Sequence, residues 1–231
     1  YAGAGIHYVA QFLRSSDGGL TWLPLTGNES FDYNYNYTGL DFTDSDHGLV
    51  TWQTIGAYAP APPKYALTFD GAVNWEVHQL PPPVDEPNLF ETFEYCEPFQ
   101  PKMLSDRAIR LLVGCFDFHD PPEEFSSYLY SSEDGGSTWT SVHLPEKVIA
   151  GQDTLFFFDA NNALLLGRDI YRSMDGGQSW EYVKSVSWDG QFTFVDPQTG
   201  WAIARADGQI ALVKTSNGGA SWIEIEPVIA P

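Results

Sequence analysis

The sequence predicts an all-β fold of repeated four-stranded antiparallel units, and three observations support this prediction. An eight-residue pattern recurs five times along the 231 residues. A second pattern, a short turn between two apolar runs, lies between successive copies of the first. No segment has the 3.6-residue apolar periodicity of an amphipathic helix. Strands without helices that repeat about every 40 residues or more are typical of the blades of a β-propeller.

The eight-residue pattern, hereafter the octet, has a hydroxyl residue first, Asp third, Gly fifth, a hydroxyl residue seventh and Trp last. Three copies are intact and two are altered, one with Ala72 in place of Gly and one with Asn217 in place of Asp. The octets cover residues 15–22, 68–75, 132–139, 173–180 and 215–222. The residues that define them are Ser15, Asp17, Gly19, Trp22, Asp70, Trp75, Ser132, Asp134, Gly136, Trp139, Ser173, Asp175, Gly177, Trp180, Asn217, Gly219 and Trp222.

Each octet is interpreted as the turn of a β-hairpin. The Asp carboxylate can accept hydrogen bonds from backbone N–H groups two or three residues on, and Gly supplies the positive φ that closes the turn. The aromatic Trp then suits the start of a half-buried strand. Because an active site is needed once and a fold element is needed in every repeat, five copies indicate a structural role.

The second pattern sets the register of the blades. It places Asp44, Asp106, Asp159 and Asp196 at turns between the first and second strands of a blade. The third strand then leads into an octet, and the octet Trp opens the fourth strand. This register predicts about five blades in one domain, residues 1–231, with an incomplete first blade. Two alternatives stay open: the ring closes within the chain, or residues of a larger protein or ring complete it.

The octet resembles the Asp-box, or BNR repeat, of sialidases, xyloglucanases, the sortilin ectodomain and photosystem II assembly factor-like propellers. The resemblance covers essentially the whole chain, since the five octets span it. It implies that each octet joins the third and fourth strands of a propeller blade. It implies no single activity, because that family includes hydrolases, receptors and scaffolds.

Charge and composition exclude several classes of partner. The net charge of −20 argues against nucleic acid and anionic membrane surfaces, whose own negative charge would repel this chain. No apolar run of about 18 residues is present, so no membrane span is expected. The chain opens without Met or a signal peptide, and we expect a mature or trimmed product. No cofactor is predicted.

The two cysteines, Cys96 and Cys115, are predicted to form a disulfide. If Asp106 lies at a hairpin turn, antiparallel pairing places these two residues opposite each other on the first and second strands of the third blade. A disulfide indicates an oxidising compartment, so the predicted location is secreted or extracytoplasmic, at the cell surface or in the periplasm. The alternative is two buried free thiols.

The long loops indicate where a partner binds. In this register the octets lie on one face of the ring, while the second-to-third loops and the links between blades lie on the other, hereafter the connector face. Every long loop falls on the connector face of the first three blades: residues 24–37, 54–64, 80–95 and 116–125. Such loops are usually functional or disordered. The candidate partner-binding residues are Tyr33, Tyr35, Tyr58, Phe93, Phe118 and Asp120, and the acids around Asp120 favour a cationic or neutral partner.

These observations favour a non-catalytic propeller that binds a protein or carbohydrate partner as a binding or scaffold protein, or that serves as one module of a larger assembly. The alternative is a glycoside hydrolase of the sialidase or xyloglucanase type. A sialidase site needs three clustered Arg, a Tyr activated by Glu and an acidic Asp, and none of the Arg residues lies in the sialidase arginine motif. For this reason no catalytic residue is predicted. The acidic stretch 117–124 matches no metal-ligand spacing, so no metal site is predicted either.

Overall fold

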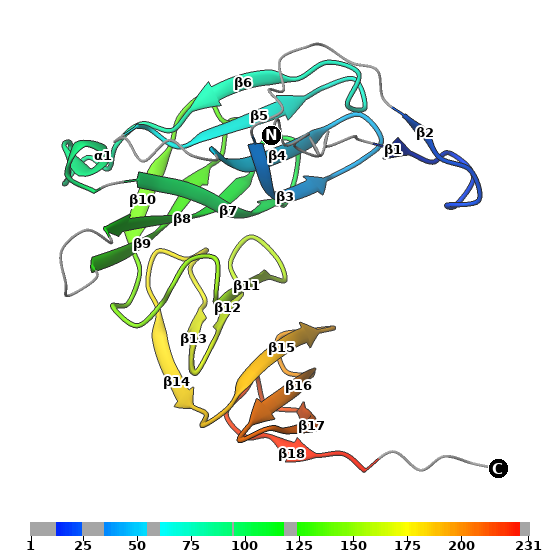
Figure 1. The fold of residues 1–231 in the computed structure, drawn as a ribbon, viewed down its shortest axis with the longest axis vertical. Coiled ribbons are helices and arrows are strands. Elements are labelled where there is room, and N and C mark those ends of the chain that lie inside the picture. The colour runs from blue at the N-terminus through cyan, green and yellow to red at the C-terminus, as the bar shows by residue number, and fades with distance from the viewer. Residues whose placement is uncertain (1–12, 25–34, 55–60, 94, 118–123, 227–231) are drawn as a thin grey trace, which may run out of the picture.

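The computed structural model describes residues 13–24, 35–54, 61–93, 95–117 and 124–226. These residues form four four-stranded antiparallel sheets and one two-stranded sheet (Figure 1). The only described helix is the four-residue α1 (Leu89–Thr92), far short of the length that crosses a membrane. The prediction of an all-β propeller with about five blades and an incomplete first blade is confirmed.

The sheets follow chain order, and in each complete blade the four strands are hydrogen-bonded neighbours in sequence. The first blade holds β1 (Leu13–Arg14) and β2 (Leu23–Pro24). The strands of the other blades are β3 (Tyr35–Phe42), β4 (Gly48–Thr54), β5 (Lys64–Thr68) and β6 (Glu76–Gln79); β7 (Tyr95–Met103), β8 (Ile109–Asp117), β9 (Glu124–Ser132) and β10 (Thr140–His143); β11 (Thr154–Phe157), β12 (Ala163–Leu166), β13 (Asp169–Ser173) and β14 (Glu181–Ser185); and β15 (Asp189–Phe194), β16 (Gly200–Ala206), β17 (Gln209–Thr215) and β18 (Ile223–Glu224).

The core consists of apolar layers between successive sheets. Alternate residues of β12 face opposite neighbours: Leu165 packs in one cluster with Leu129 of the third blade, while Leu164 and Leu166 pack in another with Phe194 of the fifth. This alternation is the expected pattern for a strand that is buried on both faces. In Figure 1 the sheets follow an arc, with β1–β2 and β15–β18 at its two separate ends.

The turns between first and second strands use one acceptor side chain each. Asp44, Asp159 and Asp196 accept hydrogen bonds from the backbone N–H groups two and three residues on, at 2.7–2.8 Å. In the third blade the prediction that Asp106 fills this position is wrong by one residue. The hydroxyl of Ser105 accepts these bonds instead, because a serine can cap the same turn.

The octets form the turns between third and fourth strands, with a hydrogen-bond pattern that differs in one respect from the expected one. In the fourth blade, the buried Ser173 hydroxyl accepts a bond from the Gly177 N–H at 2.8 Å. The Asp175 carboxylate accepts from the Ser179 N–H at 2.9 Å, four residues on rather than two or three. Hydrogen bonds from the Ser179 hydroxyl and N–H lower the pKa of Asp175 to about 2. Asn217 accepts the equivalent backbone bond in the fifth blade.

The glycine requirement of the octets is broader than the sequence pattern. The fourth octet position, treated as free in that pattern, has positive φ between 66° and 74° in all five copies. These residues are Gly18, Gly71, Gly135, Gly176 and Gly218. Ala72, at the fifth position, keeps a φ of 70° although it is not glycine. The turn geometry is therefore retained in the altered copies.

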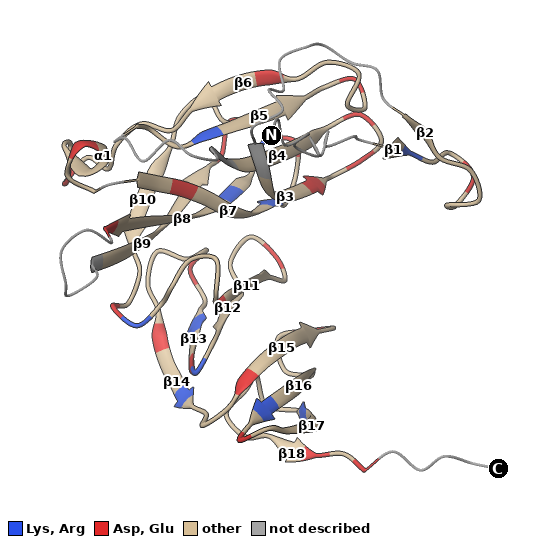
Figure 2. Cartoon of the chain, viewed as in Figure 1, with Lys and Arg blue, Asp and Glu red and all other residues tan. Residues whose placement is uncertain are grey.

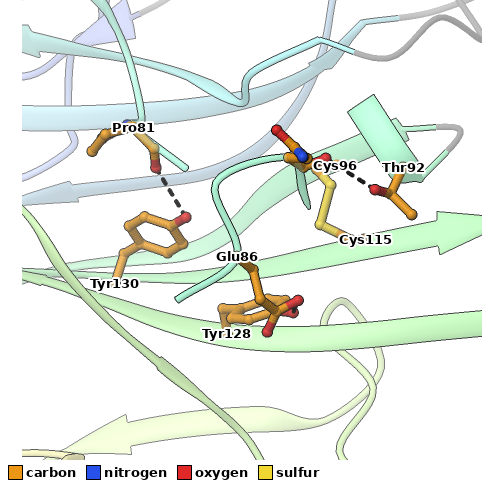
Figure 3. Close-up of a disulfide and its surroundings, with 8 residues drawn as sticks. Pro81, Glu86, Thr92, Cys96, Cys115, Tyr128 and Tyr130 are labelled. Carbon is orange, nitrogen blue, oxygen red and sulfur yellow. Dashed lines mark hydrogen bonds between the residues drawn. A yellow bond between two sulfur atoms is a disulfide. The ribbon is translucent and has the colours of Figure 1, made fainter. Parts of the chain in front are cut away.

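Cys96 and Cys115 are joined by a disulfide, as predicted, and lie opposite each other on β7 and β8. The neighbouring loop, residues 80–95, is not the structureless loop that its length predicted. It contains α1, whose Leu89 is buried, and the Tyr130 hydroxyl donates a hydrogen bond to the Pro81 carbonyl at 3.0 Å (Figure 3). This insertion thus packs onto the third blade.

Candidate functional site

A cavity of about 590 Å³ opens between the fourth and fifth blades. It is lined by the link before β11, by the β12–β13 turn and by the start of β15. A second cavity of about 480 Å³, over the β16–β17 turn, shares Arg168 and Asp189 with the first. All of these segments belong to the connector face, and the two cavities together are hereafter the connector groove.

The charged residues of the connector groove are held in pairs. The Arg168 guanidinium donates two hydrogen bonds to the Asp189 carboxylate, at 2.7 and 3.0 Å. The Lys147 ammonium lies 2.9 Å from the Asp169 carboxylate, which also accepts a bond from the Ser185 hydroxyl. These bonds, the Ser185 bond foremost, lower the pKa of Asp169. Both carboxylates are thereby held ionised.

The connector groove is rich in cations for so acidic a chain. The whole sequence has 11 Lys and Arg against 31 Asp and Glu, and three of those cations, Lys147, Arg168 and Arg205, line the groove. Figure 2 shows a blue segment on β16, the strand that carries Arg205. A groove that offers both N–H donors and carboxylate acceptors suits a polar ligand such as a peptide or a sugar.

Asp153 lines the groove beside Gly167, where the absence of a side chain leaves room for the Asp153 carboxylate. Its carboxylate accepts a hydrogen bond from the Ile149 N–H at 2.8 Å. A side chain at Gly167 would collide with this carboxylate, so the turn between β12 and β13 needs glycine there. Burial, as the main cause, raises the pKa of Asp153, and the charge of Asp169 raises it further.

An apolar wall completes the groove. Phe192, Ile149 and Leu166 contribute to the lining of the larger cavity. A Cβ atom at Gly190 would lie 2.6 Å from the Trp188 ring and 2.9 Å from the Phe192 ring, so bare backbone is required beside these aromatics. Apolar walls with a few fixed polar groups are typical of ligand-binding clefts.

Most of the predicted partner-binding residues lie outside the described part of the chain. Tyr33, Tyr58, Phe118 and Asp120 are in this group, and for Tyr35 only the backbone, at the start of β3, is described. Phe93 is partly buried and packs against the core between the second and third blades. These residues stay predictions. The residues of the connector groove were missed, because they lie in short turns that showed no unusual length.

One Tyr–Glu pair, the signature expected of a sialidase-like site, is present in the described structure. The Tyr128 hydroxyl donates a hydrogen bond to Glu86 at 3.0 Å (Figure 3). Burial, followed by the bond to Glu86, raises the pKa of Tyr128. An activated tyrosine nucleophile requires the opposite shift. The pair therefore fits an anchor for the 80–95 insertion better than a catalytic group.

The sequence matches no protein-family profile and no curated protein. Among solved structures it is similar to the GH74 xyloglucanase from Xanthomonas campestris, with 17% identity and a TM-score of 0.55 over 91% of this chain and 34% of that enzyme. It is also similar to YCF48 bound to a D1 peptide (12% identity, TM-score 0.45, 83% and 81% covered) and to the Niastella koreensis GH74 enzyme (13% identity, TM-score 0.35, 88% and 42% covered). This chain spans about a third of the xyloglucanase, and the similarity supports the propeller fold alone.

Replacing Asp153 by Asn is expected to change how stability depends on pH. A folded-state pKa above the ordinary value of about 4 means that the folded protein loses stability as pH rises through that raised pKa. Asp153→Asn keeps an acceptor for the Ile149 N–H and removes the charge. The variant should therefore match the wild type below about pH 4 and become more stable than it at higher pH, by a margin that stops growing once the pH passes the raised pKa, as measured by urea unfolding at several pH values.

The matched control is Asp207→Asn, which removes the same charge from an exposed position on the groove rim. Its pH profile should run parallel to that of the wild type. A profile of Asp153→Asn that also runs parallel to the wild type would contradict the burial of this carboxylate.

Proposed function

We propose that this protein is a non-catalytic binding or scaffold propeller that holds a protein or carbohydrate partner on its connector face, outside the cytoplasm. The partner occupies the connector groove, with the candidate aromatic residues of the long loops as further contacts on the same face. The net charge of −20 favours a neutral or cationic partner.

The observation that carries this proposal is the arrangement of fixed charge pairs beside an apolar wall. Arg168–Asp189 and Lys147–Asp169 are preorganised by their own hydrogen bonds, and Phe192 lies in the same cavity. A ligand that leaves both ion pairs intact can still bond to their free N–H groups and carboxylate oxygens. Because these groups are already held in position, binding loses less side-chain conformational entropy. Rigid blades that support a groove on one face are a common basis for recognition.

The disulfide supports the proposed location. Cys96 and Cys115 form a closed pair, and such bonds persist in oxidising compartments. It agrees with a protein that is secreted or located at the cell surface or in the periplasm.

Paired arginine variants test the proposal. Wild type is screened against a panel of synthetic peptides of both charges and neutral oligosaccharides, and each binder is titrated by calorimetry. Arg168→Ala, in the groove, should raise the Kd about tenfold, the loss of roughly one charge-assisted hydrogen bond. The control is Arg172→Ala, which removes the Arg172–Glu181 ion pair at 2.9 Å, outside the groove. Both changes affect exposed ion pairs, so both proteins should fold.

A ligand whose affinity falls equally in both variants, or only in Arg172→Ala, would contradict binding in the connector groove. If the negative charge of the protein contributes to recognition, added salt should weaken the binding of cationic peptides and leave the binding of neutral ligands unchanged.

A second candidate, glycoside hydrolase, is favoured by one observation. Asp153 and Asp169 face the same cavity, with the pKa of the first raised and that of the second lowered. Such a divergence is the usual mark of an acid and its ionised partner. Turnover of xyloglucan or of an aryl sialoside that Asp153→Asn abolishes, with ligand affinity retained, would establish this candidate and overturn the non-catalytic one.

A further inference from the structure

A recurring contact joins the octets of the third, fourth and fifth blades to the blade before each of them. A Cβ atom at Gly219, in the fifth-blade octet, would lie 3.2 Å from Ile170 of the fourth blade. A Cβ atom at Gly177, in the fourth-blade octet, would collide with Leu129 of the third. A Cβ atom at Gly136 would lie 3.2 Å from the Tyr65 hydroxyl of the second blade. The residue at the fifth octet position thus packs directly against a side chain of the preceding blade.

The side chains that receive these glycines occupy one equivalent position. Each lies on a third strand, three residues before its own octet begins, and each is buried, with exposures of 1% for Tyr65, 1% for Leu129 and 0% for Ile170. The equivalent residue of the last blade is Leu212, three residues before Thr215. Leu212 is 40% exposed. The last blade therefore has Leu212 at the receiving position, and no described octet packs against it.

Three further apolar residues of that sheet face are uncovered as well, beside the polar Gln191, Arg205 and Lys214. Ile203 pairs with Leu212 across β16 and β17 and is 40% exposed, whereas Leu166, its equivalent in the fourth blade, is 1% exposed. Ile210 and Ile223 are 70% and 65% exposed. Ile203, Ile210, Leu212 and Ile223 are hereafter the terminal face. Isolated exposed apolar residues are ordinary on protein surfaces, but a continuous set on one sheet face marks a contact.

The first octet lacks the matching contact. Gly19 has a φ of 91°, close to the 86–89° of its equivalents, yet a Cβ atom there would meet only its own Trp22, at 3.7 Å. Trp22 is 57% exposed, whereas Trp75 of the next octet is 5% exposed. A cavity of about 300 Å³ lies between Trp22 and Phe42, where the first hairpin adjoins the second blade. Within the described residues, the first octet therefore lacks a receiving side chain, and Leu212 lacks an octet packed against it.

We propose that the terminal face is the docking surface for the first octet, Ser15–Trp22, of the same chain, with Gly19 seated on Leu212, so that the five blades close into a ring. In the structure the two surfaces lie at the two ends of the arc (Figure 1). The same chain is favoured over a second copy because the sheets already follow one arc, and propeller blades are arranged radially around a central channel, which brings the first and last blades of a chain together. Ile210 also lines the smaller cavity of the connector groove, so the terminal face borders the proposed ligand site, whereas Gly19 and Leu212 line neither cavity.

Engineered cysteines test this contact directly. The two native cysteines are already bonded to each other, so Gly19→Cys with Leu212→Cys adds the only free pair. The matched control is Gly219→Cys with Ile170→Cys, the same two positions at a blade junction that is formed in the structure. After mild oxidation of the monomer at about 10 µM, dilute enough to disfavour bonds between chains, both pairs should be closed within one chain, as read by non-reducing electrophoresis and peptide mass spectrometry.

Free thiols at positions 19 and 212, with the control pair closed, would overturn the proposal. A bond that forms only between two chains would overturn it in favour of a second copy. A second measurement uses variants without added cysteines, in case the double cysteine variant misfolds. Leu212→Asp should lower the Tm. Val84→Asp, at a residue that is 91% exposed, should leave the Tm unchanged. Equal effects of these two substitutions would also overturn ring closure.

Discussion

Reduction of the Cys96–Cys115 disulfide is expected to lower the free energy of unfolding by about 3 kcal/mol, and the Tm by roughly 6 to 12 °C for a domain of this size. The bond closes a loop with a sequence separation of 19 residues. In the chain-entropy model, opening such a loop enlarges the unfolded ensemble, which is the main source of the lost stability. Scanning calorimetry with and without reductant measures the change.

The structure adds a local reason for a large effect. The disulfide lies at the point where the 80–95 insertion enters β7, and the insertion buries Leu89 and Phe90 against the third blade. The double variant Cys96→Ala with Cys115→Ala is the control, since its Tm should be low and indifferent to reductant. A wild-type Tm that does not move when both thiols are demonstrably free would contradict the prediction.

The fold could be predicted because its signals are local. The Asp and Gly of each octet determine a turn through hydrogen bonds within eight residues, and the bond from Ser179 to Asp175 spans only four. Such signals are readable from sequence alone. The error at Asp106 has the same origin: Ser105 carries the equivalent acceptor, and the two residues are adjacent, so a pattern that seeks Asp selects the wrong one.

The connector groove could not be predicted because its parts are distant in sequence. Lys147, Asp169 and Asp189 come from three different segments and converge only when the fourth and fifth blades pack together. Their turns are short, so loop length gave no signal. Gly167 was the one local clue, since a glycine in a two-residue turn can mark a close approach, here that of Asp153.

The contact between an octet and the preceding blade gives a second large prediction. Gly177→Ala is expected to lower the free energy of unfolding by about 2 to 5 kcal/mol. Two costs contribute: a non-glycine residue at a φ of 89° costs about 1 to 2 kcal/mol, and an added methyl that collides with Leu129 costs about 1 to 3 kcal/mol. Urea unfolding monitored by tryptophan fluorescence measures the change.

Gly208→Ala separates the two costs. Gly208 has a φ of 76°, and a Cβ atom there would have no neighbour within 4 Å, so this variant carries the backbone cost without the collision. It should lose about 1 to 2 kcal/mol, and the excess loss in Gly177→Ala measures how tightly the fourth blade is seated on Leu129. Equal losses in the two variants would mean that Leu129 moves aside at little cost. The fifth octet position would then be a requirement of the turn alone, and its role in joining successive blades would have to be abandoned.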